Sequence, residues 1–235
     1  MKIGFYGHSN CAYRSSDSFI DIIANYFDAE IVNTGVKQGS EERILYELKK
    51  TKQLDLAVIF HSIPSSIFLP NCNRDLVLRD MSDIRMQYLL FEQEKDITVD
   101  HEDYNQTLKK QFYDIETFKN VLEVHKNYFY NPDVLLNRYY GALIQIDKYL
   151  IDKQIPTIHV LEKTLPRWLS LQSGIVDFNI MKLTKQHRLL PDKRFVSNCI
   201  TIEGNLKVAD NLKLLMNQIL QVKGCGSLHS QPPVL

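Results

Sequence analysis

The chain has 235 residues and a formal net charge of zero, from 28 basic and 28 acidic residues. This length is typical of one large domain, and the 44% hydrophobic and 24% charged content is that of a soluble globular protein. The balanced charge excludes a global attraction to nucleic acid or to an anionic membrane, and no apolar run approaches the roughly 18 residues of a membrane span. We therefore expect neither nucleic acid nor a membrane as a partner.

The N-terminus and the cysteines indicate a reducing compartment. Met1 and Lys2 lead directly into an apolar stretch, without the charged region, apolar region and cleavage site of a signal peptide. The four cysteines lie far apart and form no C-x-x-C pair, so they predict neither a zinc site nor a disulfide framework. We expect a cytoplasmic protein without a signal peptide.

The first 60 residues alternate between strand and helix patterns. Residues 2–7 form an apolar run that ends at a glycine, and a serine-rich segment then caps a helix of about three turns. A second strand spans residues 30–35 and ends in a glycine, residues 39–42 open a second helix with acids in its first turn, and residues 54–60 form an apolar third strand. This order predicts an α/β fold with a doubly wound, flavodoxin-like parallel sheet of about four to five strands.

The remaining chain adds a long insertion and a return to the sheet. We predict a loop over residues 62–75, helical segments over about 76–94 and 104–128, and a helix that begins at Asn131-Pro132. Residues 155–161 form the fourth strand, in which His159 is expected to be a core or sheet-face histidine, and residues 173–177 receive no assignment. Thr201 caps a final helix. The domain prediction is a single α/β domain over 1–223, with a helical insertion and return helix over 62–154, and a flexible tail over 224–235.

Ser9 is the first candidate for chemistry. The first strand breaks at Gly7, and the next residues form the turn Gly7-His8-Ser9. Open α/β sheets keep their sites at the carboxyl ends of their strands, where this turn lies. The alternative interpretation is an ordinary polar turn between a strand and a helix.

Over most of its length, the chain resembles the SGNH/GDSL hydrolase superfamily, especially its divergent members in bacteriophages, although its motifs are degenerate. Gly7-His8-Ser9 is similar to the block that carries the nucleophilic serine, although His8 stands in place of the usual aspartate. The segment 33–40 is similar to the block whose glycine offers its N–H group to the oxyanion, and we choose Gly39 over Gly35 for this role. The resemblance implies an SGNH-type α/β fold.

Two other blocks depart from the family pattern. The third block should supply an asparagine, but the third strand is followed by His61, which could donate a hydrogen bond or act as a base toward Ser9. The alternative interpretation of His61 is a structural histidine at the end of a strand. The block before the last helix should supply a histidine, but Cys199 stands in its place. Asp192, the nearest preceding acid, lies seven residues before Cys199 instead of at the short family spacing. A thiol with a pKa near 8.5 is a poor replacement for imidazole as a base.

The resemblance implies a serine ester hydrolase for small acyl esters, such as O-acetyl groups on a glycan, without a cofactor. The alternative is a catalytically degenerate SGNH-fold protein with a binding or virion structural role, whose partners are virion proteins or further copies of the chain. Its location is then the host cytoplasm or the virion. A third interpretation is an unrelated flavodoxin-like protein, but the chain contains neither a P-loop nor a Gly-x-Gly-x-x-Gly motif after its first strand.

Overall fold

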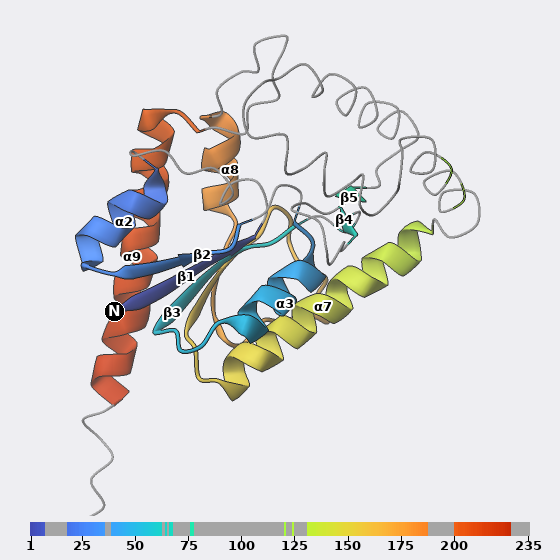
Figure 1. Cartoon of the computed structure of the whole chain (residues 1–235), viewed down its shortest axis with the longest axis horizontal. Coiled ribbons are helices and arrows are strands. Elements are labelled where there is room, and N and C mark those ends of the chain that lie inside the picture. The colour runs from blue at the N-terminus through green and yellow to red at the C-terminus, as the bar shows by residue number, and fades with distance from the viewer. Residues whose placement is uncertain are drawn as a thin grey trace, which may run out of the picture.

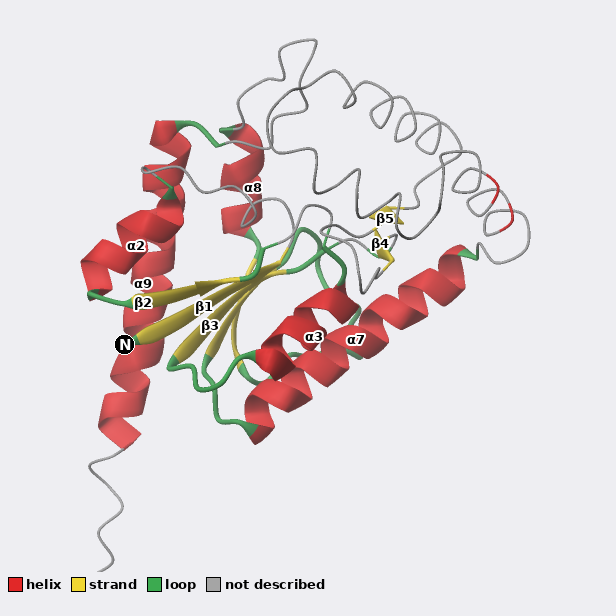
Figure 2. Ribbon diagram, viewed as in Figure 1, coloured by secondary structure: helices red, strands yellow, loops and turns green. Residues whose placement is uncertain are grey.

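The computed structural model describes residues 1–7, 18–35, 39–62, 64, 66–67, 76–77, 120, 124, 131–187 and 200–226. These residues form a five-stranded sheet with helices on both faces (Figures 1 and 2). All four pairings within this sheet are parallel. The predicted α/β class with a parallel sheet is therefore confirmed.

The strand order places a topological switch point between the first and third strands. The sheet has the order β2-β1-β3-β6-β7. Its strands are β1 (Lys2–Gly7), β2 (Glu30–Asn33), β3 (Leu56–Phe60), β6 (Thr157–Val160) and β7 (Gly174–Asp177). The chain moves outward from β1 to β2 and then returns to the other side of β1. Ligands of such sheets bind beyond the carboxyl ends of the strands at this reversal.

Two helical layers bury the sheet (Figure 1). One layer contains α2 (Phe19–Phe27), α8 (Asn179–Gln186) and α9 (Ile202–Gly226), and the other contains α3 (Glu41–Lys50) and α7 (Pro132–Asp152). Successive side chains of a strand point to opposite faces, so Val58 and Phe60 of β3 pack with the first layer and Ala57 and Ile59 pack with the second. The residue after β3 in this alternation, His61, belongs to the face covered by α3 and α7.

Polar residues begin the helices at the positions that the sequence predicts. The side chain of Ser40 accepts a hydrogen bond from the Arg43 N–H group and so caps α3. Asn131 caps α7, whose first residue is Pro132. The Thr201 hydroxyl accepts the Gly204 N–H group at the start of α9.

Three elements differ from the predictions. Residues 174–177 form β7, a short edge strand whose residues are exposed or half-buried, so its sequence lacks the apolar run of a central strand. The helix α8, which follows it, was also not predicted. Leu76–Val77, where we expected a helix to begin, is β5 and pairs antiparallel with β4 (Ser66–Ile67). The other residues of the insertion up to 130, apart from 62, 64, 120 and 124, lie outside the described residues.

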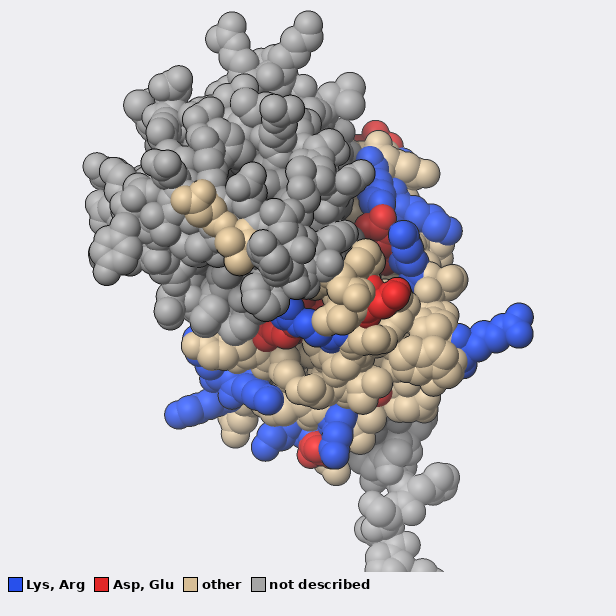
Figure 3. Space-filling model, turned by 90° about the vertical axis from the view of Figure 1, so that its right-hand side faces the viewer, with Lys and Arg blue, Asp and Glu red and all other residues tan. Residues whose placement is uncertain are grey.

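On the face shown in Figure 3, both lysine or arginine side chains and aspartate or glutamate side chains lie among uncharged residues of the described surface. No helix in the described part of the chain combines the length and the apolar character needed to cross a bilayer.

Candidate functional site

The carboxyl end of β1 is fixed by a glycine. Gly7 has a φ angle of 143°, and a Cβ atom there would lie 2.3 Å from the Phe60 carbonyl oxygen of β3. Only glycine tolerates this close approach in this conformation. The strand β1 therefore ends at the switch point with Gly7 packed against Phe60 of β3. Ser9, the predicted nucleophile, is two residues further on and lies outside the described residues.

Gly39, the predicted oxyanion donor, is buried immediately before the Ser40 cap of α3. The N-terminus of α3 lies beside the end of β3, because the next residue, Glu41, bonds to the backbone of Ser62. A helix N-terminus offers free N–H groups and a positive dipole end, which favour negative charge. The glycine thus lies near the edge of the sheet at which β1 and β3 end.

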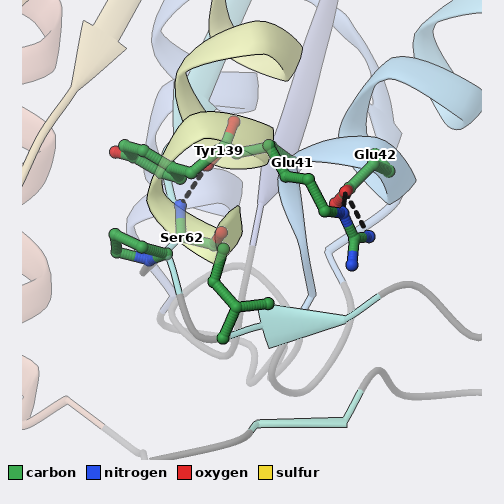
Figure 4. Close-up of a pocket in the computed structure, with 7 residues that line it drawn as sticks. Glu41, Glu42, Ser62 and Tyr139 are labelled. Carbon is green, nitrogen blue, oxygen red and sulfur yellow. Dashed lines mark hydrogen bonds and ion pairs between the residues drawn. The ribbon is translucent and has the colours of Figure 1, made fainter. Parts of the chain in front are cut away.

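Glu41 joins α3 to the segment after β3. One oxygen of its carboxylate accepts the Ser62 N–H group at 2.6 Å, and the other lies 2.9 Å from His61 Nδ1. Glu41 and His61 are each 1% exposed. Figure 4 shows the Glu41 side chain turned toward Ser62, whereas the neighbouring Glu42 forms an ion pair with Arg138 at the surface. The buried carboxylate fixes the first turn of α3 against the end of β3.

The hydrogen bonds continue from His61 into the sheet. His61 Nε2 lies 2.8 Å from His159 Nδ1, and His159 Nε2 lies 2.8 Å from Ser173 Oγ. The two imidazole planes differ by 12° with centroids 5.1 Å apart, the arrangement of rings joined by an in-plane hydrogen bond. Ile59 pairs with His159 in the parallel register. His61 lies two residues after Ile59 on the same face, so it is the diagonal neighbour of His159. His159 is a buried sheet-face histidine, as predicted.

The acceptor character of the Glu41 carboxylate determines the tautomers along this chain. With one proton on each imidazole, His61 donates from Nδ1 to Glu41, its Nε2 accepts from His159 Nδ1, and His159 Nε2 accepts from the Ser173 hydroxyl. Burial, and to a smaller extent the adjacent His61, holds the pKa of His159 well below 6.5. His159 is therefore neutral at neutral pH.

Asp147 of α7 holds the loop before β7. Its carboxylate accepts the N–H groups of Gln172 and Ser173, the latter at 2.8 Å, and one oxygen lies 3.7 Å from His159 Nε2. Asp147 is 7% exposed. These bonds fix the backbone that carries the Ser173 hydroxyl.

A small pocket lies between α3, α7 and the segment after β3 (Figure 4). Burial, and then the charge of Glu41, raises the pKa of Tyr139 in its wall, so this phenol stays protonated. Within the described ranges, no three histidine, cysteine, aspartate or glutamate side chains are arranged to hold a metal ion. The residues that line the pocket are Glu41, Glu42, Ser62, Pro64, Leu135, Arg138 and Tyr139.

Asn205 of α9 joins the start of α2 to the residue that precedes Thr201. Its side-chain oxygen accepts the Phe19 N–H group at 3.0 Å, and its amide donates to the Ile200 carbonyl at 3.2 Å. The segment 8–17, which contains Ser9, ends before Ser18, and the segment 188–199, which contains Asp192 and Cys199, ends before Ile200. Ser9, Asp192 and Cys199 all lie outside the described residues, so the structure does not place them.

The chain matches no protein-family model, and no curated protein sequence is significantly similar to it. The assignment of a function therefore depends on the residues themselves.

His61, the predicted base or donor, is described, and both of its ring nitrogens have partners in Glu41 and His159. It can accept a proton from Ser9 only after one of these hydrogen bonds breaks. Its role toward Ser9 stays a prediction. Sequence reasoning did not join Glu41, His159 and Ser173 to His61, and no motif could have done so, because 20, 98 and 14 residues separate successive members.

Proposed function

We propose that the chain is a serine ester hydrolase of the SGNH type that uses Ser9 as its nucleophile. The observation that supports this proposal is the end of β1 at Gly7, against β3, on the same edge of the sheet as the buried Gly39. Ser9 follows Gly7 by two residues, so its chain position suits a site at this edge.

In this mechanism, Ser9 Oγ attacks the acyl carbonyl, and the N–H groups of Ser9 and Gly39 stabilise the resulting oxyanion. A single donor of this kind contributes about 10²–10³ in rate. The bonds from Glu41 to Ser62 and His61 support this role, because they hold the N-terminus of α3, and thus the segment after Gly39, against β3. The substrate class is a small acyl ester such as a glycan O-acetyl group, which follows from the family resemblance.

The second candidate is a catalytically degenerate domain of the same fold, with a binding or virion structural role. Two observations favour it: both ring nitrogens of His61 are occupied by buried partners, and Cys199 stands where the family has its histidine. Without a base, a serine hydroxyl is a weak nucleophile.

Labelling with a fluorophosphonate probe tests the hydrolase proposal, with adducts located by peptide mass spectrometry. The proteins are the native chain and its Ser9→Ala, Cys199→His and Ser170→Ala variants, the last being a control because Ser170 is an exposed serine in a loop. An adduct on Ser9 in the native chain supports the hydrolase. An adduct on Ser9 that requires Cys199→His supports the degenerate domain, and its absence from every variant removes Ser9 from the chemistry.

A further inference from the structure

A second serine is joined to a complete set of proton-transfer groups. Ser173 Oγ, His159, His61 and Glu41 follow one another at contact distances of 2.8, 2.8 and 2.9 Å. A hydroxyl bonded to an imidazole that is itself oriented by a further group is the geometric signature of an activated nucleophile. This set contains neither Ser9 nor Gly39, so the inference does not depend on the proposed function.

His61 can hold the positive charge that the buried His159 cannot hold at low cost. His159 is fully buried, and an imidazolium there is costly. When Ser173 gives its proton to His159 Nε2, the proton on His159 Nδ1 can pass to His61 Nε2 in the same direction. The positive charge then lies on His61, beside the carboxylate of Glu41, and His159 remains neutral.

The surroundings of Ser173 limit what it can do. Ser173 is half-buried immediately before the edge strand β7, whereas its ring partner His159 is fully buried. Its own N–H group is bonded to Asp147 and is not free to stabilise an oxyanion. A site of this kind suits a single covalent transfer better than repeated turnover.

We propose that Ser173 is a reactive hydroxyl that accepts one acyl or phosphonyl group from an activated ester, with Glu41, His61 and His159 as the proton relay. In phosphonyl transfer from a fluorophosphonate, the bond from Ser173 Oγ to phosphorus forms, the P–F bond breaks and fluoride leaves, while the hydroxyl proton passes to the relay. In acyl transfer, the bond from Ser173 Oγ to the acyl carbon forms and the ester C–O bond breaks. The leaving alkoxide takes a proton from His159 Nε2, and the proton on His61 Nε2 returns to His159 Nδ1. The products are the acylated serine and an alcohol.

One substitution reverses the donor and acceptor roles along the relay and keeps all of its hydrogen bonds. In the Glu41→Gln variant, the amide oxygen can accept the Ser62 N–H group and the amide nitrogen can donate to His61 Nδ1. His61 then donates from Nε2 to His159, and His159 donates from Nε2 to Ser173. Every hydrogen bond is kept, but the Ser173 hydroxyl no longer faces a free lone pair. Glu42→Gln is the matched control, because Glu42 is adjacent and pairs with Arg138 outside the relay.

The test follows fluorophosphonate adducts on Ser173 over time by peptide mass spectrometry, with ¹⁵N NMR of the histidine tautomers. We expect the native chain and Glu42→Gln to react at Ser173 at least about 10²-fold faster than at exposed Ser170 in the same molecule, since a positioned base typically contributes 10²–10⁴. Glu41→Gln should lose this advantage as both tautomers reverse, and Ser173→Ala should lose the adduct.

Reaction at Ser173 no faster than at Ser170 in the native chain overturns the proposal, and this comparison needs no variant to fold. Equal rates in native protein and in Glu41→Gln with reversed tautomers also overturn it. An adduct on Ser9 alone supports the proposed hydrolase and rejects the Ser173 site. An adduct on Ser173 alone supports the Ser173 site and speaks against the proposed hydrolase.

Discussion

Replacing Glu41 with alanine is expected to lower the free energy of unfolding by about 2–4 kcal/mol. The substitution removes the acceptor of two buried donors, the Ser62 N–H group and His61 Nδ1. A buried group left without a partner costs about 1–3 kcal/mol, and His61 can recover part of this loss by changing its tautomer. The same substitution at Glu42 removes a surface ion pair with Arg138 and should cost less than about 1 kcal/mol.

Urea unfolding measures both effects. With an m-value near 2 kcal/mol/M, the midpoint of Glu41→Ala should fall by about 1–2 M and that of Glu42→Ala by less than about 0.5 M. Glu41→Gln should recover most of the loss, because it keeps an acceptor for Ser62 and a partner for His61. Equal midpoints for the two alanine variants would refute the argument that the buried carboxylate stabilises the junction of α3 and β3.

Three further predictions concern single residues. Unfolded His159 binds a proton below pH 6.5 and folded His159 does not, so the free energy of unfolding should fall as the pH decreases below 6.5, by up to about 1.4 kcal/mol per pH unit. Urea unfolding of His159→Gln at several pH values should show a shallower fall. A pH dependence equal to that of the native chain would contradict this prediction. Gly7→Ala should lower the free energy of unfolding by about 2 kcal/mol or more, because the added Cβ would lie 2.3 Å from the Phe60 carbonyl oxygen. A thermal midpoint equal to that of the native chain would exclude this clash. Asn205→Ala should lower the free energy of unfolding, measured in urea, by about 1–3 kcal/mol, because the Phe19 N–H group loses its acceptor. Asn211→Ala, on the same helix, should lower it by less. A larger loss for Asn211→Ala would be inconsistent with the bond from Phe19 to Asn205.

Local patterns predicted the strands and helices as far as β3, and also β6 and the starts of α7 and α9. The apolar run of β3 indicated a strand covered on both faces, and Ser40 and Asn131 began their helices as expected. These predictions are correct because each feature depends on residues within a few positions of one another. The edge strand β7 escaped prediction, since four half-buried or exposed residues carry too weak a pattern.

The sequence by itself determined that the chain alternates strands and helices around a parallel sheet, and it identified Gly7, Gly39 and His61 as residues at the ends of those elements. Only the tertiary structure decided what His61 contacts. The parallel register of Ile59 with His159 joins residues 98 positions apart, and the packing of α3 brings Glu41 to the other side of the same ring. The physical reason is that hydrogen bonds between side chains depend on distances of about 3 Å in space, which no spacing along the chain specifies once several elements intervene.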